Sequence, residues 1–223
     1  MKNYKSIIFD HRHFIGSTGA VVDIYDKSVT QVASFEGFKK AYDIMLSPDG
    51  KLLCVSSPLG YIRIYSLETF TQAGSITVEK KNDNDGGMLF SNDGKLLYNV
   101  ENVKDDLRCT VAVYNTTDFS LERRIELPIS TAILEFEYDR SKEKYYVIGY
   151  VRGETGYDFV SEFCDSGIVS PVRVTKSECN MYTNLKCFEN RGRKIGNSDV
   201  ESITNRGFTL AKLYEFRKAN PII

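Results

Sequence analysis

An internal repeat is the feature that most constrains how this chain can fold. The segment SPDGKLL at 47–53 returns as SNDGKLL at 91–97, and a looser copy, YDRSK, occupies 138–142. A second marker, an apolar residue followed by an aromatic and a polar one, recurs about once in every 40 to 50 residues. Its aromatic positions are Tyr25, Tyr65 and Tyr114, with weaker copies at Phe163 and Tyr214. Self-similarity at a fixed period predicts a series of similar structural units.

The segment 42–66 shows what one unit contains. Tyr42 to Leu46 is mostly apolar, and the turn at 47–50 follows, where proline presets φ and glycine accepts a positive φ. Leu52 to Ser56 is a short apolar run, and a second turn follows it at 58–60. Tyr61 to Tyr65 then alternates between two faces as a half-buried strand does. Short strands with tight turns at this period are typical of the blades of a β-propeller.

The length of 223 residues predicts a single all-β domain, a β-propeller of about five four-stranded antiparallel blades. The blades are expected at approximately 1–38, 39–82, 83–130, 131–176 and 177–223. The last one is the least regular. Few β formers occur at 190–199, and 208–219 is compatible with a strand or a helix. The ring therefore closes with a thin last blade or with help from another chain.

The repeated segments resemble known propeller families. Residues 44–66 are similar to a blade of the WD-repeat or YVTN-type β-propellers, and MLFSNDGKLLY at 88–98 looks like the corresponding part of bacterial lactonase-like propellers. The likeness covers 41–128 and is weaker outside it. No Trp-Asp dipeptide occurs, since Tyr-Asp, Tyr-Ser and Tyr-Asn stand in its place. The resemblance implies a propeller fold and, because WD-repeat propellers are mostly scaffolds, a protein-binding function.

Composition and charge argue against several other classes of protein. The net charge of −1 provides no field that would attract nucleic acid or an anionic membrane. The first 13 residues lack a signal-peptide h-region, and the longest largely apolar stretch, 145–151, is too short to cross a bilayer. We therefore expect a cytoplasmic protein. The five cysteines include no CxxC pair and are expected to be small buried hydrophobes.

Three patterns in the sequence resemble metal or catalytic sites, but each also has a purely structural interpretation. His11 and His13 form a His-x-His pair, but they lie at an expected polar turn and have no obvious third metal ligand. The segment 82–87 lacks the spacing of an EF-hand. Glu135 and Glu137 alternate on a strand, as paired catalytic carboxylates or the wet face of a sheet would. We expect no catalytic residue, metal or cofactor. The alternative is a hydrolase of lactones or sugars, which the lactonase-like motif suggests.

The topology of a propeller predicts a binding face. The blade-to-blade connections share one rim with the turns between second and third strands, and rigid exposed loops of this kind bind partners. We predict that this rim binds a protein. A homo-oligomer that completes the last blade is the alternative to a ring that one chain closes with a thin last blade. The expected contact residues are Phe38, Lys39, Pro58, Leu59, Lys80, Asp105 and Arg152.

Overall fold

The computed structural model describes most of the chain to residue 174 and two later segments. The described residues are 2–9, 12–41, 43–78, 87–102, 109–126, 131–139, 144–151, 158–164, 167–174, 193–194 and 201–209. The chain divides into two compact units: Met1–Ser57, Ile62–Gly74 and Cys187–Ile223 form one, and Pro58–Tyr61 and Ser75–Lys186 form the other. The regular secondary structure of the described part is β-strand throughout.

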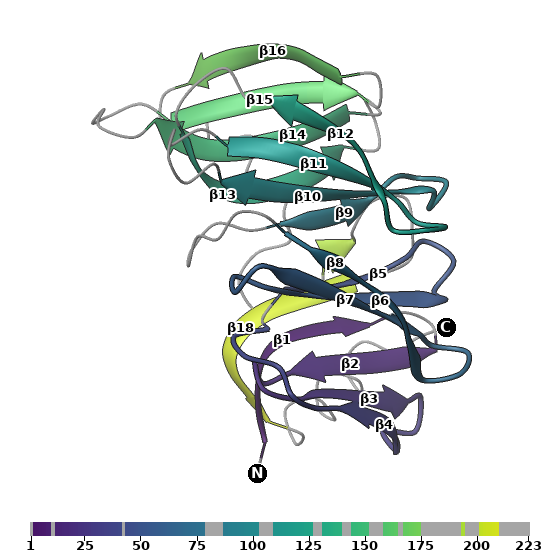
Figure 1. Ribbon diagram of the computed structural model, residues 1–223. Coiled ribbons are helices and arrows are strands. Elements are labelled where there is room, and N and C mark those ends of the chain that lie inside the picture. The colour runs from purple at the N-terminus through teal and green to yellow at the C-terminus, as the bar shows by residue number, and fades with distance from the viewer. Residues whose placement is uncertain are drawn as a thin grey trace. The chain divides into compact units, whose positions relative to one another are not determined.

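Two sheets come from the first third of the chain (Figure 1). In both, strands that follow each other in the chain are neighbours in the sheet. The first contains β1 (Asn3–Phe9), β2 (His13–Ser17), β3 (Val22–Asp26) and β4 (Gln31–Phe35). The second contains β5 (Asp43–Leu46), β6 (Leu52–Ser57), β7 (Tyr61–Ser66) and β8 (Thr71–Thr77). β7 shows why these segments form strands. Its side chains alternate between two faces, so that Ile62 and Ile64 are buried while Tyr61 and Arg63 are only partly buried.

Two more four-stranded sheets follow in the same pattern. The third contains β9 (Met88–Phe90), β10 (Leu96–Asn102), β11 (Cys109–Asn115) and β12 (Leu121–Glu126). The fourth contains β13 (Thr131–Asp139), β14 (Lys144–Val151), β15 (Asp158–Cys164) and β16 (Gly167–Val174). The pairings within them are antiparallel. The prediction of an all-β chain with four-stranded antiparallel sheets is therefore confirmed.

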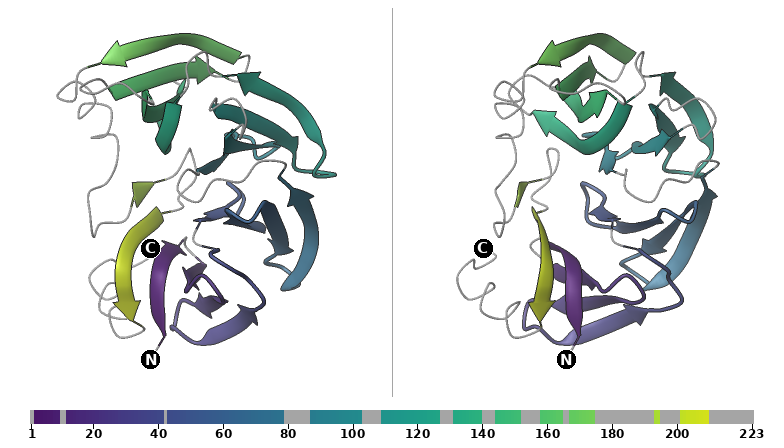
Figure 2. Two further views of the ribbon diagram at one scale, coloured as in Figure 1. Left: turned by 60° about the vertical axis from the view of Figure 1, so that its left-hand side comes forward. Right: turned by 90° about the vertical axis from the view of Figure 1, so that its left-hand side faces the viewer.

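Two late strands extend the first sheet. β18 (Glu201–Thr209) runs antiparallel to β1 and places Phe208 opposite Tyr4, and β17 (Arg193–Lys194) pairs with β18 (Figure 2). The described strands of the expected fifth blade are thus part of the sheet that begins the chain. Most of the segment 208–219 lies outside the described residues, and a separate fifth blade stays a prediction.

The repeated turns have the same hydrogen bonds. In the first copy, Ser47 Oγ donates to Asp49 Oδ1 at 2.6 Å, and Asp49 Oδ1 also accepts from the Lys51 amide at 3.0 Å. The equivalent distances around Asp93 in the second copy are 2.8 and 3.1 Å. These bonds, first the one from the Lys95 amide, lower the pKa of Asp93 to about 2. Gly50 and Gly94 close the turns at φ 69° and 73°, where side chains are disfavoured.

The aromatic marker of the repeat is a core position. Tyr25, Tyr65 and Tyr114 lie on the third strands β3, β7 and β11, and all three are buried. Cys54 on β6 is buried too, as expected for a small hydrophobe, and its burial raises the pKa of its thiol. The markers that revealed the period are therefore residues that stabilise the sheets.

Bulky residues adopt a left-handed backbone at equivalent turns. Val29, Phe70 and Phe119 have φ values of 62°, 53° and 61°, and each lies between the third and fourth strands of its sheet. This conformation costs an L-residue roughly 1–2 kcal/mol. At Phe70 a contact offsets part of the cost, because its ring packs edge-on against His13 with centroids 6.2 Å apart.

Replacing Val29 with asparagine is expected to stabilise the protein by about 1 kcal/mol, because asparagine tolerates the left-handed region that valine does not. The turn's own hydrogen bond, from the Val29 amide to the Asp26 carbonyl at 2.9 Å, uses only backbone atoms and is retained. Urea unfolding followed by circular dichroism measures the change. As a comparison, Phe70→Asn should gain less, since it loses the ring contact with His13. An unchanged or lower midpoint for Val29→Asn would contradict this account.

Candidate binding surface

The connection between β4 and β5, residues 36–41, is anchored to the preceding turn within one unit. The Phe38 amide donates to the Ala20 carbonyl at 3.2 Å, and the Ala41 amide donates to the Gly19 carbonyl at 3.0 Å. Gly19 and Ala41 form an isolated antiparallel bridge. The connection therefore follows the β2–β3 turn with its backbone fixed at two points.

Two buried hydroxyl groups hold the same connection from the strands. Ser57 Oγ, at the end of β6, donates to the Lys39 carbonyl at 2.6 Å. Ser17 Oγ, at the end of β2, donates to the Ala41 carbonyl. Carbonyl groups that are held by buried donors cannot reorient without losing those bonds. The backbone around Lys39 is thus positioned by both the first and the second sheet.

Phe38 anchors the connection through its side chain. It is only 4% exposed, and its ring contacts Tyr65 edge-on at 6.1 Å between centroids. The Arg63 guanidinium lies over the same ring at 5.0 Å, a cation–π geometry, while Tyr65 stacks on Phe35 at 3.9 Å. Phe38, which the sequence placed among the contact residues, is therefore part of the core beneath the surface.

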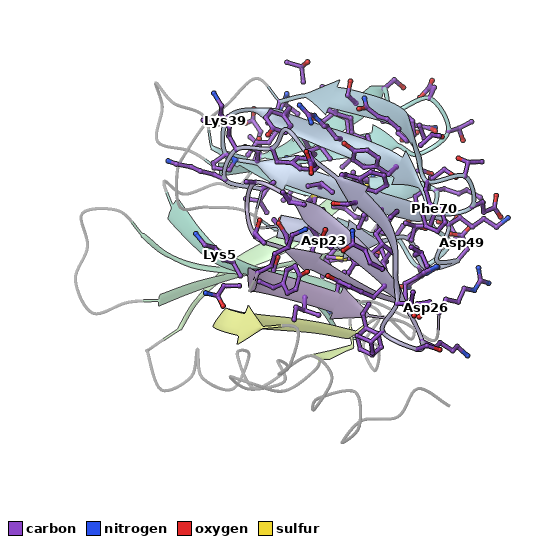
Figure 3. The ribbon with its side chains drawn as sticks, turned by 90° about the horizontal axis from the view of Figure 1, so that it is seen from below. Lys5, Asp23, Asp26, Lys39, Asp49 and Phe70 are labelled. Carbon is purple, nitrogen blue, oxygen red and sulfur yellow. The ribbon has the colours of Figure 1, made fainter. Side chains whose placement is uncertain are left out.

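The connection presents a lysine doublet and one acidic residue, Glu36, to solvent. Lys39 and Lys40 are both exposed, and Lys40 has a φ of 53°. Figure 3 shows Lys39 at one end of the strands, and Asp26, Asp49 and Phe70 at the other. Lys ammonium groups on a fixed backbone form charge-assisted hydrogen bonds with carboxylates or phosphates. Lys40 was not among the predicted contact residues, although it belongs to the Lys39-Lys40 doublet of the sequence.

The other predicted contact residues fall into two groups. Pro58 and Leu59 lie in the β6–β7 turn, where Pro58 is partly exposed and Leu59 is 38% exposed. Lys80, Asp105 and Arg152 lie outside the described residues. Lys39 is thus the charged contact residue of the prediction that lies in the described part of the chain, and it lies on a connection whose backbone is anchored by hydrogen bonds.

A buried polar network occupies the first sheet. Asp23 on β3 accepts hydrogen bonds from Lys2 Nζ at 2.9 Å, Tyr4 Oη at 2.7 Å and Ser34 Oγ at 2.8 Å. Tyr4 Oη also shares a hydrogen bond of 2.6 Å with Tyr25 Oη. Burial, followed by these bonds, raises the pKa of Tyr4, and the bond to Asp23 raises that of Lys2. The carboxylate is satisfied by its neighbours, as in a structural network.

A second network surrounds Glu101 on β10. Tyr114 Oη donates to Glu101 Oε1 at 2.6 Å, Asn99 Nδ2 donates to the same oxygen at 3.3 Å, and Arg124 forms an ion pair with Oε2. The Glu101 side chain is fully buried. Both carboxylate oxygens of Glu101 accept hydrogen bonds from neighbouring side chains. We therefore interpret this group as structural rather than as a general base.

The patterns weighed for chemistry lie on different strands or outside the described residues. His13 opens β2, Glu135 and Glu137 lie on β13, and His11 and residues 82–86 fall outside the described part. Among the described side chains, no three His, Cys, Asp or Glu residues gather as a metal site would require. The same part of the chain contains no apolar helix of membrane-spanning length.

Comparisons with known proteins identify the fold. No protein-family model and no curated protein sequence matches the chain. Its structure is similar to Kuenenia stuttgartiensis hydrazine synthase, with a TM-score of 0.63 and 16% identity over 75% of this chain and 47% of that one. It is also similar to the dihydro-heme d1 dehydrogenase NirN in complex with DHE, with a TM-score of 0.54 and 14% identity over 76% of this chain and 34% of that one. Both are β-propeller proteins.

The fold is a β-propeller. The four-stranded sheets are its blades, and the segment 36–41 is a blade-to-blade connection of the propeller. The chain spans less than half the length of either neighbour. Identities of 16% and 14% show a shared fold and carry no chemistry from one protein to the other.

Proposed function

We propose that this propeller is a cytoplasmic, non-catalytic protein-binding module of the WD-repeat or YVTN-like type. The observation that supports the proposal is the β4–β5 connection, whose backbone is fixed by hydrogen bonds while Lys39 and Lys40 are exposed. A contact segment that is ordered before binding loses little conformational entropy when the complex forms. The connection is thus suited to a specific partner.

The lysine doublet of the connection indicates the chemistry of that partner. Two adjacent ammonium groups favour a segment of protein that carries aspartate or glutamate side chains. In the propeller topology the other predicted residues belong to the same rim: Pro58, Leu59, Lys80, Asp105 and Arg152. They are proposed as the rest of the contact face, and Phe38 as the anchor that holds Lys39 in place.

A catalytic role has less support. The named neighbours are a synthase and a dehydrogenase, but their likeness to this chain is one of fold. The buried carboxylates of Asp23 and Glu101 have hydrogen-bond donors on both oxygens. No observation in the described part favours the hydrolase that the lactonase-like motif suggested.

Charge reversal at the connection tests the proposal. Short peptides that bind the full chain are selected from a random library, and their affinity is measured by isothermal titration calorimetry. We expect acidic peptides to be selected and Lys39→Glu/Lys40→Glu to weaken binding by at least about tenfold, with a weaker salt dependence. The matched control is Lys27→Glu/Lys51→Glu, which reverses two exposed lysines in turns at the opposite end of the strands. The proposed contact surface would be wrong if the Lys39→Glu/Lys40→Glu variant bound the peptides as tightly as the wild type, or if the control variant lost as much affinity.

A further inference from the structure

One edge strand of the described sheets lacks the usual protection. β4, β8, β12 and β16 each form the margin of a sheet, with a strand neighbour on one side among the described residues. Exposed edges pair with other chains unless charges or prolines interrupt them. β12, with the sequence LERRIE, is heavily charged, and β16 contains Pro171. β8, with the sequence TQAGSIT, has seven residues and contains neither a charge nor a proline.

The side chains of β8 leave this edge accessible. Thr71, Gln72, Ala73, Ser75 and Thr77 are exposed. The centre of the strand, Ala73-Gly74-Ser75, has small side chains, which let a second backbone approach closely. β4 differs, because it has only five residues and its Phe35 and Ser34 side chains are engaged with Tyr65 and Asp23. β8 is therefore the most open of these edges.

The sequence of β8 is compatible with its own copy. A two-fold axis perpendicular to a sheet pairs residues that point to the same face. The axis that pairs all seven residues passes through Gly74, and it places Thr71 opposite Thr77, Gln72 opposite Ile76 and Ala73 opposite Ser75. No like charges meet. The same operation on the central part of β12 would set Arg123 or Arg124 opposite its own copy, which is repulsive.

We propose that β8 is a self-association edge, along which a second copy of this chain pairs antiparallel about a two-fold axis at Gly74. The two β5–β8 sheets then form one continuous sheet across the dimer. Main-chain hydrogen bonds of β8 supply the contact, and the small, uncharged side chains permit it. This interface is separate from the lysine connection of the proposed function, and the two are tested independently.

A charge exchange tests both the edge and its register. The full chain is examined by native mass spectrometry and light scattering from low micromolar to several hundred micromolar concentration, where we expect a monomer–dimer equilibrium. Ala73→Lys/Ser75→Lys sets lysines opposite each other twice and should raise the dissociation constant at least tenfold. Ala73→Lys/Ser75→Glu sets opposite charges together in the same register and should retain the dimer. Val32→Lys, at an exposed position of β4, is the matched control and should also retain it.

Three outcomes would overturn the proposal. The wild type could be monomeric at the highest concentration, the Lys/Lys variant could dimerise as well as the wild type, or the Lys/Glu variant could lose the dimer as completely as the Lys/Lys variant. Circular dichroism and the melting temperature show whether each variant is folded. Should the Lys/Lys variant unfold, a folded Lys/Glu variant that is monomeric at a concentration where the wild type is a dimer would still overturn the proposal.

Discussion

Replacing Gly16 with alanine is expected to destabilise the protein by about 3 kcal/mol, the combined cost of overpacking and of a disrupted buried hydrogen bond. A Cβ atom at Gly16 would lie 2.5 Å from Tyr4 Cδ1 and 2.7 Å from Tyr4 Cγ. The Tyr4 ring crosses β2 at this glycine on its way from β1 to Asp23 and Tyr25 on β3. It is fully buried, so it cannot move aside without breaking these bonds.

The same substitution in a protein that lacks the Tyr4 ring shows whether the clash with Tyr4, rather than any side chain at position 16, causes the loss of stability. In a Tyr4→Ala protein, Gly16→Ala should cost less than about 1 kcal/mol, since the ring that it would meet is absent. Urea unfolding of the four proteins in this cycle measures the coupling free energy. Equal costs in the two backgrounds would show that Tyr4 is not the cause.

Removing the Glu101 side chain is expected to cost about 3–5 kcal/mol, the range for breaking a buried ion pair from one side. Glu101→Ala leaves the Arg124 guanidinium, whose side chain is only 23% exposed, without its carboxylate. It also removes the acceptor of the Tyr114 hydroxyl and of Asn99 Nδ2. The free energy of unfolding from urea titration, with near-ultraviolet circular dichroism as a packing signal, measures the loss.

Replacing both members of the ion pair should be less harmful than replacing one. Glu101→Leu/Arg124→Met substitutes apolar side chains of similar volume, so no uncompensated charge stays buried. We expect this double variant to recover a large part of the stability lost in Glu101→Ala. A double variant as unstable as Glu101→Ala would indicate that the hydrogen bonds to Tyr114 and Asn99, rather than the stranded charge, dominate the cost.

Local patterns were sufficient for the strands and turns. The predicted segments at 42–46, 52–56 and 61–65 correspond to β5, β6 and β7, with ends that differ by no more than one residue. Period-two alternation and turn chemistry act between residues that are close in the chain, so they can be read without knowing the fold. The recurrence of Ser47-Pro48-Asp49-Gly50 as Ser91-Asn92-Asp93-Gly94 then indicated the repeat, and the hydrogen bonds in the two turns are the same.

The candidate surface was predictable only in part. The Lys39-Lys40 doublet and the position of a blade-to-blade connection follow from sequence and topology. The role of Phe38 does not, because its burial depends on Tyr65 and Arg63, which arrive from another strand. The anchoring by Ser17 and Ser57 is hidden for the same reason, since a serine at a strand end has no sequence mark that names its acceptor.

The sequence by itself determined the all-β class, the repeat and most strand positions, because these depend on interactions between near neighbours. Only the tertiary structure decided which distant residues meet. It placed β18 beside β1, Tyr4 across Gly16, and the Asp23 and Glu101 carboxylates among their donors. Such contacts depend on how strands far apart in the chain pair and on how sheets pack. The sequence pattern of a single segment does not specify which distant segment it will contact.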